Sequence, residues 1–413
     1  MRIGYLVPEF PGQTHIFFWR ERESLARMGI ECDLVSTRKP PQKLITHSWS
    51  QAAMCDTRYL SPLGVRGLLS GIGAILHSGP AGTLRALAAI LRADVSSLRQ
   101  RLRLAGLALT GAHLASLARR HGWAHLHAHS CGDSAHVALF AHLIGGVPYS
   151  MTLHGPLSDY GPNQAMKWRH AAFGIVITNR LFGELHAAIG DLKPGRVDIA
   201  PMGVDIERFR RGAPYVPWKG EGPFKIFSCG RLNPCKGHDD LIRAVALLRE
   251  AGIEATLNIA GADDTGGWYQ AQLLALIEQL RLHQAVSLLA AVPEAGVIRH
   301  LEASHAFSLA SLNEPLGVAI MEAMAMELPV VVTKGGGVQE LVTHSQDGIL
   351  VEARNPADLA AGLQFVATQP DAALALAASA RQRIAHSFQS TQSALTLARR
   401  LGVRSQSSRE VGK

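Results

Sequence analysis

The chain has 413 residues, of which 47% are hydrophobic and 18% charged, so it is long enough for two domains with sizeable cores. Its net charge of +8 is uneven: residues 1–220 carry 25 Lys and Arg against 14 Asp and Glu, whereas residues 221–413 carry 16 against 19. No recognisable nucleic-acid module accompanies the basic half, so we expect no nucleic-acid partner. An anionic membrane surface or a pyrophosphate-bearing acceptor explains the charge at least as well.

The cysteines and the start of the chain bear on its location. Five cysteines are scattered without a CxxC pair or a metal-ligand cluster, which fits reduced thiols. No apolar run reaches about 18 residues, so a membrane-spanning helix is not expected. The start, MRIGYLVPEFPG, becomes polar too early for a signal peptide. These features predict a cytoplasmic protein.

The first 60 residues predict a βαβ unit, with a strand at 3–7, a helix at 15–28 and a second strand at 31–37. A strand, a glycine turn and a helix N-terminus together form a common phosphate-approach geometry, and the turn here holds Gly12. The full dinucleotide fingerprint is absent, which argues against an oxidoreductase. The alternative is a plain strand-to-helix turn.

Residues 60–120 predict a long helical region that is interrupted at 77–80. Leu, Ile and Ala form stripes along it, and arginines occupy many of the remaining positions. Such stripes are usually core contacts. Basic amphipathic helices also lie on anionic bilayers, so peripheral membrane contact is a second expectation.

Two short strands with histidines at their carboxyl ends follow. The first, at 124–129, ends on His129, and the second, at 149–154, ends on His154 before a glycine turn. No carboxylate or cysteine set stands at ligand spacing near His127 and His129, so we expect no metal. A histidine at a strand end can donate a hydrogen bond to a ligand or share developing charge. Asp159 in the next loop is a weaker candidate for contact with a ligand. The alternative for both histidines is a structural role in the core.

A second domain begins after residues 206–222, which are rich in Pro, Gly, Arg and Lys and predict a linker. A strand at 224–230 then leads through Arg231 and Lys236 into a helix. A guanidinium and an ammonium five residues apart at a strand-to-helix turn can hold a pyrophosphate from two sides. The alternative is two solvated cations.

The stretch 308–341 predicts a strand, a small-residue helix at about 316–326, a second strand and a second helix, as in a doubly wound sheet. Glu314 lies in the first loop and Glu322 lies inside the helix. Eight helical residues span roughly 12 Å, so the two carboxylates suit two parts of one elongated ligand better than an adjacent acid and base.

The start of that helix offers a second kind of contact. Leu316 and Gly317 present backbone N–H groups at a helix N-terminus, where an anion is favoured. The alternative is that Glu314 only stabilises the helix start and that Glu322 is structural.

The Glu-Pro-Leu-Gly phrase, followed by a helix ending in Met-Glu-Ala-Met-Ala, resembles the signature of retaining glycosyltransferases of family 4. Gly-Arg-Leu with Lys-Gly at 230–237, Thr-x-His at 152–154 and Met-Gly-Val-Asp at 202–205 resemble further motifs of that family. The phrases Tyr-Leu-Val-Pro-Glu-Phe-Pro and Thr-His-Ile-Phe-Phe-Trp-Arg-Glu are similar to the bacterial exopolysaccharide and colanic-acid type. The resemblance covers almost the full chain.

The resemblance implies an α/β protein with the GT-B fold, in which two Rossmann-like domains face each other across a cleft. It implies an acceptor domain at 1–205, a linker at 206–222 and a nucleotide-sugar domain at 223–386. Residues 387–413 are expected to form a helix that returns to the first domain and a frayed tail.

The resemblance also assigns roles to residues. Catalytic roles fall on Glu314, which would contact the transferred sugar, and on His154. Donor-binding roles fall on Arg231, Lys236, Glu322, Leu316, Gly317 and Gly12. Weaker acceptor or cleft contacts are Gln13, His129 and Asp159.

The implied activity is transfer of a hexose, with retained configuration, from a UDP- or GDP-sugar to an undecaprenyl-diphosphate-linked oligosaccharide in exopolysaccharide biosynthesis. No Asp-x-Asp motif occurs, which agrees with chemistry that needs no metal or cofactor. The expected place is the cytoplasm, at the inner face of the membrane. The alternatives are a nucleotide-sugar 2-epimerase of the same fold and a non-catalytic nucleotide-sugar binding or scaffold protein.

Overall fold

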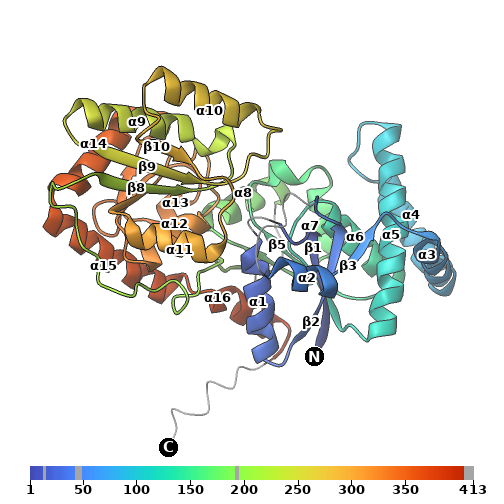
Figure 1. Cartoon of the computed structure of the whole chain (residues 1–413). Helices are drawn as coiled ribbons and strands as arrows, with labels where there is room; N and C mark the ends of the chain where they lie inside the picture. Colours follow the sequence, from blue (N-terminus) through green and yellow to red (C-terminus); the bar gives the residue numbers. More distant parts are fainter. Residues whose placement is uncertain (13–14, 42–48, 191–194, 404–413) are drawn as a thin grey trace, which may run out of the picture. The chain divides into compact units, whose positions relative to one another are not determined.

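The computed structural model describes residues 1–12, 15–41, 49–190 and 195–403. The chain divides into two compact units. Unit 1 comprises Met1–Pro201 and Thr391–Lys413, and unit 2 comprises Met202–Ser390. Figure 1 shows that each unit is a sheet with helices packed around it.

The sheet of unit 1 has seven parallel strands in the order β3-β2-β1-β4-β5-β6-β7. Their chain order reverses between β1 and β4, and ligands bind at such a point, outside the carboxyl ends of the strands. Most of these strands are continuous runs of buried residues, because helices cover both faces of a parallel sheet. The strands are β1 (Arg2–Glu9), β2 (Glu31–Arg38), β3 (Arg58–Ser61), β4 (His125–Ala128), β5 (Tyr149–Leu153), β6 (Phe173–Val176) and β7 (Val197–Ile199).

The helices of unit 1 form more than one layer. α6 packs on the sheet, α5 packs on α6, and α3 packs on α5, while α16 lies against α1. The predicted break near residue 78 separates α3 from α4. A second break separates α4 from α5. The Ser97 hydroxyl caps the start of α5 by accepting a hydrogen bond from the Gln100 N–H. The helices are α1 (Ile16–Arg27), α2 (Ser50–Asp56), α3 (Val65–His77), α4 (Gly79–Leu91), α5 (Leu98–His121), α6 (Asp133–Gly145), α7 (Gln164–His170), α8 (Asn179–Ile189) and α16 (Thr391–Arg400), with a short 3-10 turn, η2 (Leu157–Tyr160).

The sheet of unit 2 has six parallel strands in the order β10-β9-β8-β11-β12-β13, so its chain order reverses between β8 and β11. Figure 1 shows α9, α10 and α14 on one side of this sheet and α11, α12 and α15 on the other. The prediction of two Rossmann-like α/β domains is confirmed. The strands are β8 (Phe224–Cys229), β9 (Ala255–Ala260), β10 (Val286–Leu288), β11 (Ala306–Leu309), β12 (Val330–Thr333) and β13 (Ile349–Val351). The helices are η3 (Pro234–Lys236), α9 (His238–Glu250), α10 (Trp268–Gln279), α11 (Glu294–Ala303), α12 (Val318–Ala325), α13 (Val338–Leu341), α14 (Pro356–Thr368) and α15 (Pro370–Ser387).

Residues 206–222, which we expected to be a linker, are part of unit 2. Phe209 and Tyr215 are buried there, and the Arg211 guanidinium donates to the Glu302 carbonyl at 2.7 Å. The Pro- and Gly-rich composition therefore reflects irregular structure that aromatic side chains anchor to the domain.

The described residues contain no single helix that is long and apolar enough to cross a membrane. α3 and α4 together reach the required length and composition, but the chain bends by 112° between them.

Candidate active site

A first polar cluster lies at the carboxyl edge of the unit 2 sheet, where the strand order reverses. β8 leads into the loop that holds Lys236, and the adjacent β11 leads into the loop that holds Ser311 and Glu314. Lys236 Nζ forms an ion pair with Glu314 Oε2, and the Ser311 hydroxyl donates to the same oxygen at 3.0 Å. The Lys236 and Glu314 side chains are only 15% and 11% exposed, so this pair is shielded from water. Electrostatic interactions of the two charges are therefore stronger than they would be in bulk water.

The backbone around Glu314 is fixed by the glycine turn after β12. The Gly337 N–H donates to the Glu314 carbonyl at 2.8 Å, and the Glu314 N–H donates to the Gly335 carbonyl at 3.4 Å. Gly336 has φ +72°, and a Cβ there would lie 2.1 Å from the Glu314 carbonyl oxygen. A residue with a side chain would therefore push the two loops apart. The Glu314 carboxylate is thus held through both its main chain and its side chain.

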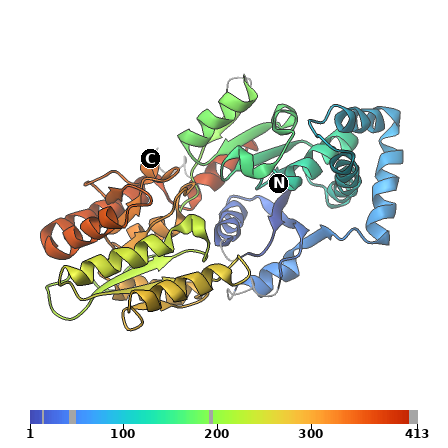
Figure 2. The same cartoon turned by 90° about the horizontal axis from the view of Figure 1, so that it is seen from above.

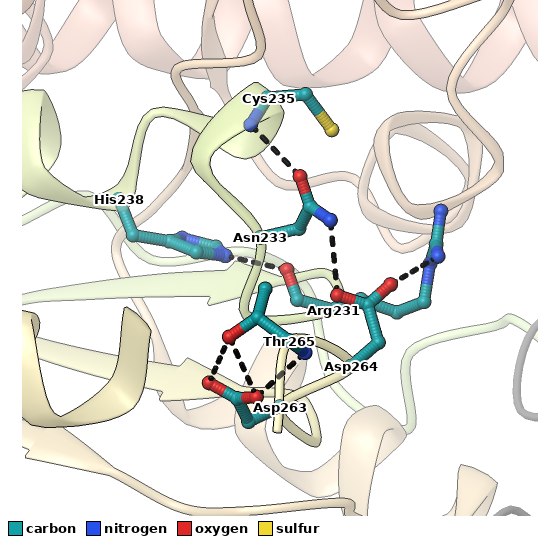
Figure 3. Close-up of polar contacts among 7 residues, drawn as sticks. All are labelled: Arg231, Asn233, Cys235, His238, Asp263, Asp264 and Thr265. Carbon is teal, nitrogen blue, oxygen red and sulfur yellow. Dashed lines mark hydrogen bonds and ion pairs between the residues drawn. The ribbon is translucent and has the colours of Figure 1, made fainter. Parts of the chain in front are cut away.

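Arg231, at the end of β8, has a different partner from Lys236 (Figure 3). Its guanidinium forms an ion pair with Asp264, and the Asn233 side-chain amide donates to the same carboxylate at 3.0 Å. Figure 3 also shows His238 Nε2, which lies 3.2 Å from the Arg231 carbonyl oxygen. Burial lowers the pKa of His238 to about 4, so this ring is neutral at pH 7 and donates its N–H to that carbonyl.

Sequence reasoning missed Asp264. Its position after β9, next to β8 in the sheet, was the available signal, because neighbouring strand ends lie together. An anionic ligand that binds Arg231 must either share the guanidinium with the Asp264 carboxylate or displace that carboxylate from it.

Asp263, next to Asp264, stabilises the start of α10. Its carboxylate accepts hydrogen bonds from the N–H groups of Thr265, Gly267 and Gln270 at 2.7 to 2.9 Å. Burial raises the pKa of Asp263, but these hydrogen bonds outweigh that effect and hold it at about 2, below its ordinary value of 3.8. The stabilisation is therefore fully present above pH 4 and is lost as the pH falls towards 2.

We accordingly expect Asp263→Ala to lower the free energy of unfolding by about 1 kcal/mol at pH 7, because the first turn of α10 loses its acceptor. Urea unfolding of both proteins at pH 7 and near pH 2 is the measurement. An equal difference at both pH values would contradict this account.

The remaining donor-site candidates lie on α12 or just before it. The helix begins at Val318, two residues later than predicted, because Gly317 takes the N-cap position with φ +97°. Leu316 is buried, and Glu322 is half-buried within the helix. Burial, and after it the charge of Glu322, raises the pKa of the Cys229 thiol to about 12, which places Glu322 near the end of β8. Both glutamates thus lie at the same edge of the sheet.

A second cluster lies in unit 1, again where the strand order reverses. His129 follows β4 and His154 follows β5, and His129 Nδ1 lies 3.2 Å from His154 Nε2. His129 Nε2 lies 2.9 Å from Glu21 Oε2, which also accepts the Tyr5 hydroxyl at 2.5 Å. The two strand-end histidines are therefore in contact, as their adjacent strands require.

Along the chain no carboxylate stands at ligand spacing from these histidines, but in the fold α1 brings Glu21 to them. Glu21 stands between Phe18 and Leu25 on the buried face of the helix, and that spacing was the missed signal. Ligand atoms of Glu21, His127 and His129 lie within 4.8 Å of one another. His127, however, already has Ser150 Oγ at 2.7 Å and Thr152 Oγ1 at 3.0 Å on its two ring nitrogens. We interpret the group as a hydrogen-bonded network.

The other predicted contacts of unit 1 are less well supported. Gly12 is buried, and its carbonyl accepts the His15 N–H at 3.1 Å. Gln13 lies outside the described residues. Asp159 is exposed in η2, and the neighbouring Ser158 hydroxyl donates to its carboxylate at 3.4 Å.

A buried lysine also escaped sequence reasoning. Lys167 is fully buried and donates to the carbonyls of Cys131 and Tyr160, which joins the loop after β4 to η2. Burial lowers its pKa to about 8. A lone lysine on a short helix gave no sequence signal of this role.

Residues 216–383 match the family described as "Glycosyl transferases group 1". This part of the chain is a group 1 glycosyltransferase domain. It contains Arg231, Lys236, Glu314 and Glu322. The resemblance seen in the sequence is thereby confirmed.

Curated relatives extend the similarity beyond this domain. The chain is 26% identical to the "Putative colanic acid biosynthesis glycosyltransferase WcaL" of Escherichia coli K12, over 94% of this chain and 96% of that protein. It is 28% identical to the "D-inositol 3-phosphate glycosyltransferase" of Pseudarthrobacter chlorophenolicus, but it spans only 49% of the length of that relative. The first alignment includes both units.

Solved structures show the same fold along the whole chain. Anabaena Alr3699/HepE, crystallised with UDP and glucose, aligns with a TM-score of 0.73 at 19% identity, over 98% of this chain and 100% of that one. Sucrose-phosphate synthase from Thermosynechococcus elongatus aligns with a TM-score of 0.71 at 18% identity, over 97% and 99%. The GT-B fold prediction is confirmed.

Proposed function

We propose that this glycosyltransferase moves a hexose from a UDP- or GDP-sugar to a lipid-linked oligosaccharide, with retention of configuration, in exopolysaccharide biosynthesis. The observation that carries the proposal is the shielded Lys236–Glu314 pair at the point in unit 2 where the strand order reverses. The relative named for colanic acid biosynthesis, which aligns over 94% of the chain, supports the pathway class. The HepE structures, one with UDP and another with UDP-glucose, support a nucleotide sugar.

In unit 2, cationic groups bind the diphosphate of the donor, and carboxylates bind its ribose and its sugar. Arg231, Lys236 and the start of α12 bind the diphosphate, and Glu322 binds the ribose. Glu314 contacts the transferred sugar as positive charge develops at its anomeric carbon. The bond from that carbon to the diphosphate breaks, and the acceptor oxygen bonds to the same face. The acceptor proton passes to the leaving diphosphate. Because Arg231, Lys236 and the start of α12 stabilise the charge of that diphosphate, we propose that no metal or cofactor is needed.

The test is a thermal-shift scan of the full chain against UDP, GDP and their common sugars, with and without EDTA. Selective stabilisation by one nucleotide that is unaffected by EDTA supports the donor site. The products formed from that donor then discriminate between activities: an epimerised free sugar indicates a 2-epimerase, and an extended oligosaccharide indicates a transferase. No response to any nucleotide argues against the proposal.

A lipid-linked acceptor requires the enzyme to work at a membrane, and α3 has the surface for that. Val65, Leu69, Ile72 and Leu76 recur every three or four residues, so they share one face of the helix, and all four are exposed. Gly71 lies on the opposite side, where a Cβ would be 2.9 Å from the Leu109 carbonyl of α5. The apolar face of α3 therefore points away from the protein core.

The neighbouring helices extend this surface. Figures 1 and 2 show α3, α4 and α5 gathered beside α6. Of the twenty exposed large hydrophobic side chains among the described residues, ten lie on these three helices. Residues 57–132 also contain nine arginines against a single acid, Asp94. Apolar side chains with arginines around them suit the headgroup region of an anionic bilayer, and we propose that these helices hold the enzyme at the inner face of the cytoplasmic membrane.

We expect the variant with Leu69→Glu and Leu76→Glu together to bind vesicles containing phosphatidylglycerol at least about tenfold more weakly than the wild-type protein. Each leucine that leaves water for the bilayer contributes more than about 1.4 kcal/mol of binding free energy, which is a factor of about ten in affinity. Co-sedimentation measures this binding. The matched control carries Leu274→Glu and Leu374→Glu, two exposed leucines of unit 2, and should bind like the wild type. Equal losses in both variants would contradict the assignment.

A further inference from the structure

The loops that follow β8 and β9 in unit 2 are joined through their main chains. The Gly230 N–H donates to the Ala260 carbonyl at 2.9 Å, and the Leu232 N–H donates to the Ala262 carbonyl at 3.0 Å. A Cβ on Gly261 would lie 1.8 Å from the Gly230 carbonyl oxygen, so only glycine allows this close approach. The pairing of the two strands therefore continues past their ends and fixes the main chains of the two loops relative to each other.

The Asp264 carboxylate, in the second of these loops, meets a hydrogen-bond donor at each of its oxygens (Figure 3). The Asn233 side-chain NH2 donates to Oδ1 at 3.0 Å, and the Arg231 guanidinium forms an ion pair with Oδ2. The Asn233 amide oxygen accepts the Cys235 N–H at 3.0 Å, which orients the NH2 towards Asp264. Two donors suit a carboxylate, because an asparagine at position 264 would turn its own NH2 towards one of them.

Asp264 is the fixed partner of this ion pair, and Arg231 is the movable one. The carboxylate is 21% exposed and is tied to Asn233, whereas the longer Arg231 side chain is 42% exposed. Ion pairs at such exposure contribute little free energy, because water screens them and the long side chain loses conformational freedom. A diphosphate offers the guanidinium several charged oxygens and bidentate hydrogen bonds, which are stronger. Arg231 therefore gains free energy when it leaves Asp264 for a diphosphate.

We propose that Asp264 is an internal competitor of the donor diphosphate: it neutralises Arg231 in the free protein, and the guanidinium leaves it when the diphosphate binds. This inference rests on the proposed function, in which Arg231 binds the diphosphate. Every binding event then breaks the ion pair, and every release of the nucleotide product restores it. Asp264 thus lowers the affinity for the nucleotide and favours release of the product, a step that limits the turnover of many enzymes.

The test is isothermal titration of the full-length protein and of Asp264→Asn with UDP, GDP and inorganic pyrophosphate. For each diphosphate that the wild type binds, we expect the variant to have a Kd about two- to fivefold lower, which is the scale of one exposed ion pair. A residue that only oriented Arg231 would have the opposite effect, because its loss would weaken binding. Asp264→Ala, which presents no NH2 to Asn233, should show the same gain and decides the question if Asp264→Asn does not fold.

A second background shows whether Asp264 acts through the guanidinium. In Arg231→Gln there is no ion pair to break, so the addition of Asp264→Asn to this variant should leave its Kd unchanged. An equal decrease of the Kd in both backgrounds would mean that Asp264 only repels the anion, and that result would overturn the proposal.

Glu254→Gln is the matched control. Glu254 is exposed and directly precedes β9, at the opposite end of the strand from Asp264, so its neutralisation removes the same charge away from the diphosphate site. Its Kd should equal that of the wild type. A Kd in Asp264→Asn and Asp264→Ala that equals or exceeds the wild-type value overturns this inference and leaves the proposed function standing. A wild-type protein that binds neither UDP nor GDP refutes the proposed function, and the inference falls with it.

Discussion

Glu314→Gln is expected to lower sugar transfer by roughly 10²–10³-fold, which is the usual effect of removing one group that acts on developing charge. In the wild-type protein Lys236 and Ser311 both donate to Glu314 Oε2. The amide of the variant keeps the shape of the carboxylate, and its oxygen can still accept these hydrogen bonds. The glycine turn continues to hold the backbone of residue 314. The loss should therefore appear in kcat, with the fold and the Kd for the nucleotide retained.

The control for this variant is Glu250→Gln. Glu250 is exposed at the end of α9, so its neutralisation removes the same charge outside the cluster. Steady-state turnover and nucleotide titration of the two variants separate a local effect from a general loss of negative charge. Transfer by a well-folded Glu314→Gln protein at the wild-type rate would reject the role that we assign to Glu314.

The sequence predicted the layout of the sheets well because strand and helix signals are local. Residues 3–7, 224–230 and 329–333 are short apolar runs bounded by turn residues, and each became a buried strand. Parallel strands joined by helices leave few arrangements, which is why the stretch 308–341 could be predicted to belong to a doubly wound sheet. Arg231, Lys236 and Glu314 were identifiable because each lies in a loop that directly follows a central strand.

The partners of these residues could not be predicted in the same way, because they depend on which side chains meet in space. Asp264 lies 33 positions after Arg231, and Glu21 lies 108 positions before His129. Neither distance produces a sequence pattern. In both cases the structure supplied a carboxylate where sequence reasoning had considered only the basic group. The buried role of Lys167 was hidden for the same reason, since its acceptors are backbone carbonyls of distant loops.

Lys236→Ala is expected to weaken binding of the nucleoside diphosphate about ten- to a hundredfold, because a hydrogen bond to a charged group contributes about 1.5–3 kcal/mol. The same change leaves the Glu314 carboxylate, which is 11% exposed, without its cation and should also destabilise unit 2. Isothermal titration with UDP and GDP, and urea unfolding, measure the two effects separately. Lys219→Ala, which removes an exposed lysine of the same unit, is the control.

A double variant separates the contact with the ligand from the contact with Glu314. Combining Lys236→Ala with Glu314→Gln removes both charges, so the unfolding free energy should recover part of the loss seen in Lys236→Ala alone. Nucleotide binding should not recover, because the ammonium that contacts the diphosphate is still missing. Recovery of binding together with stability would mean that Lys236 acts only by holding Glu314, and the direct role in diphosphate binding would then have to be abandoned.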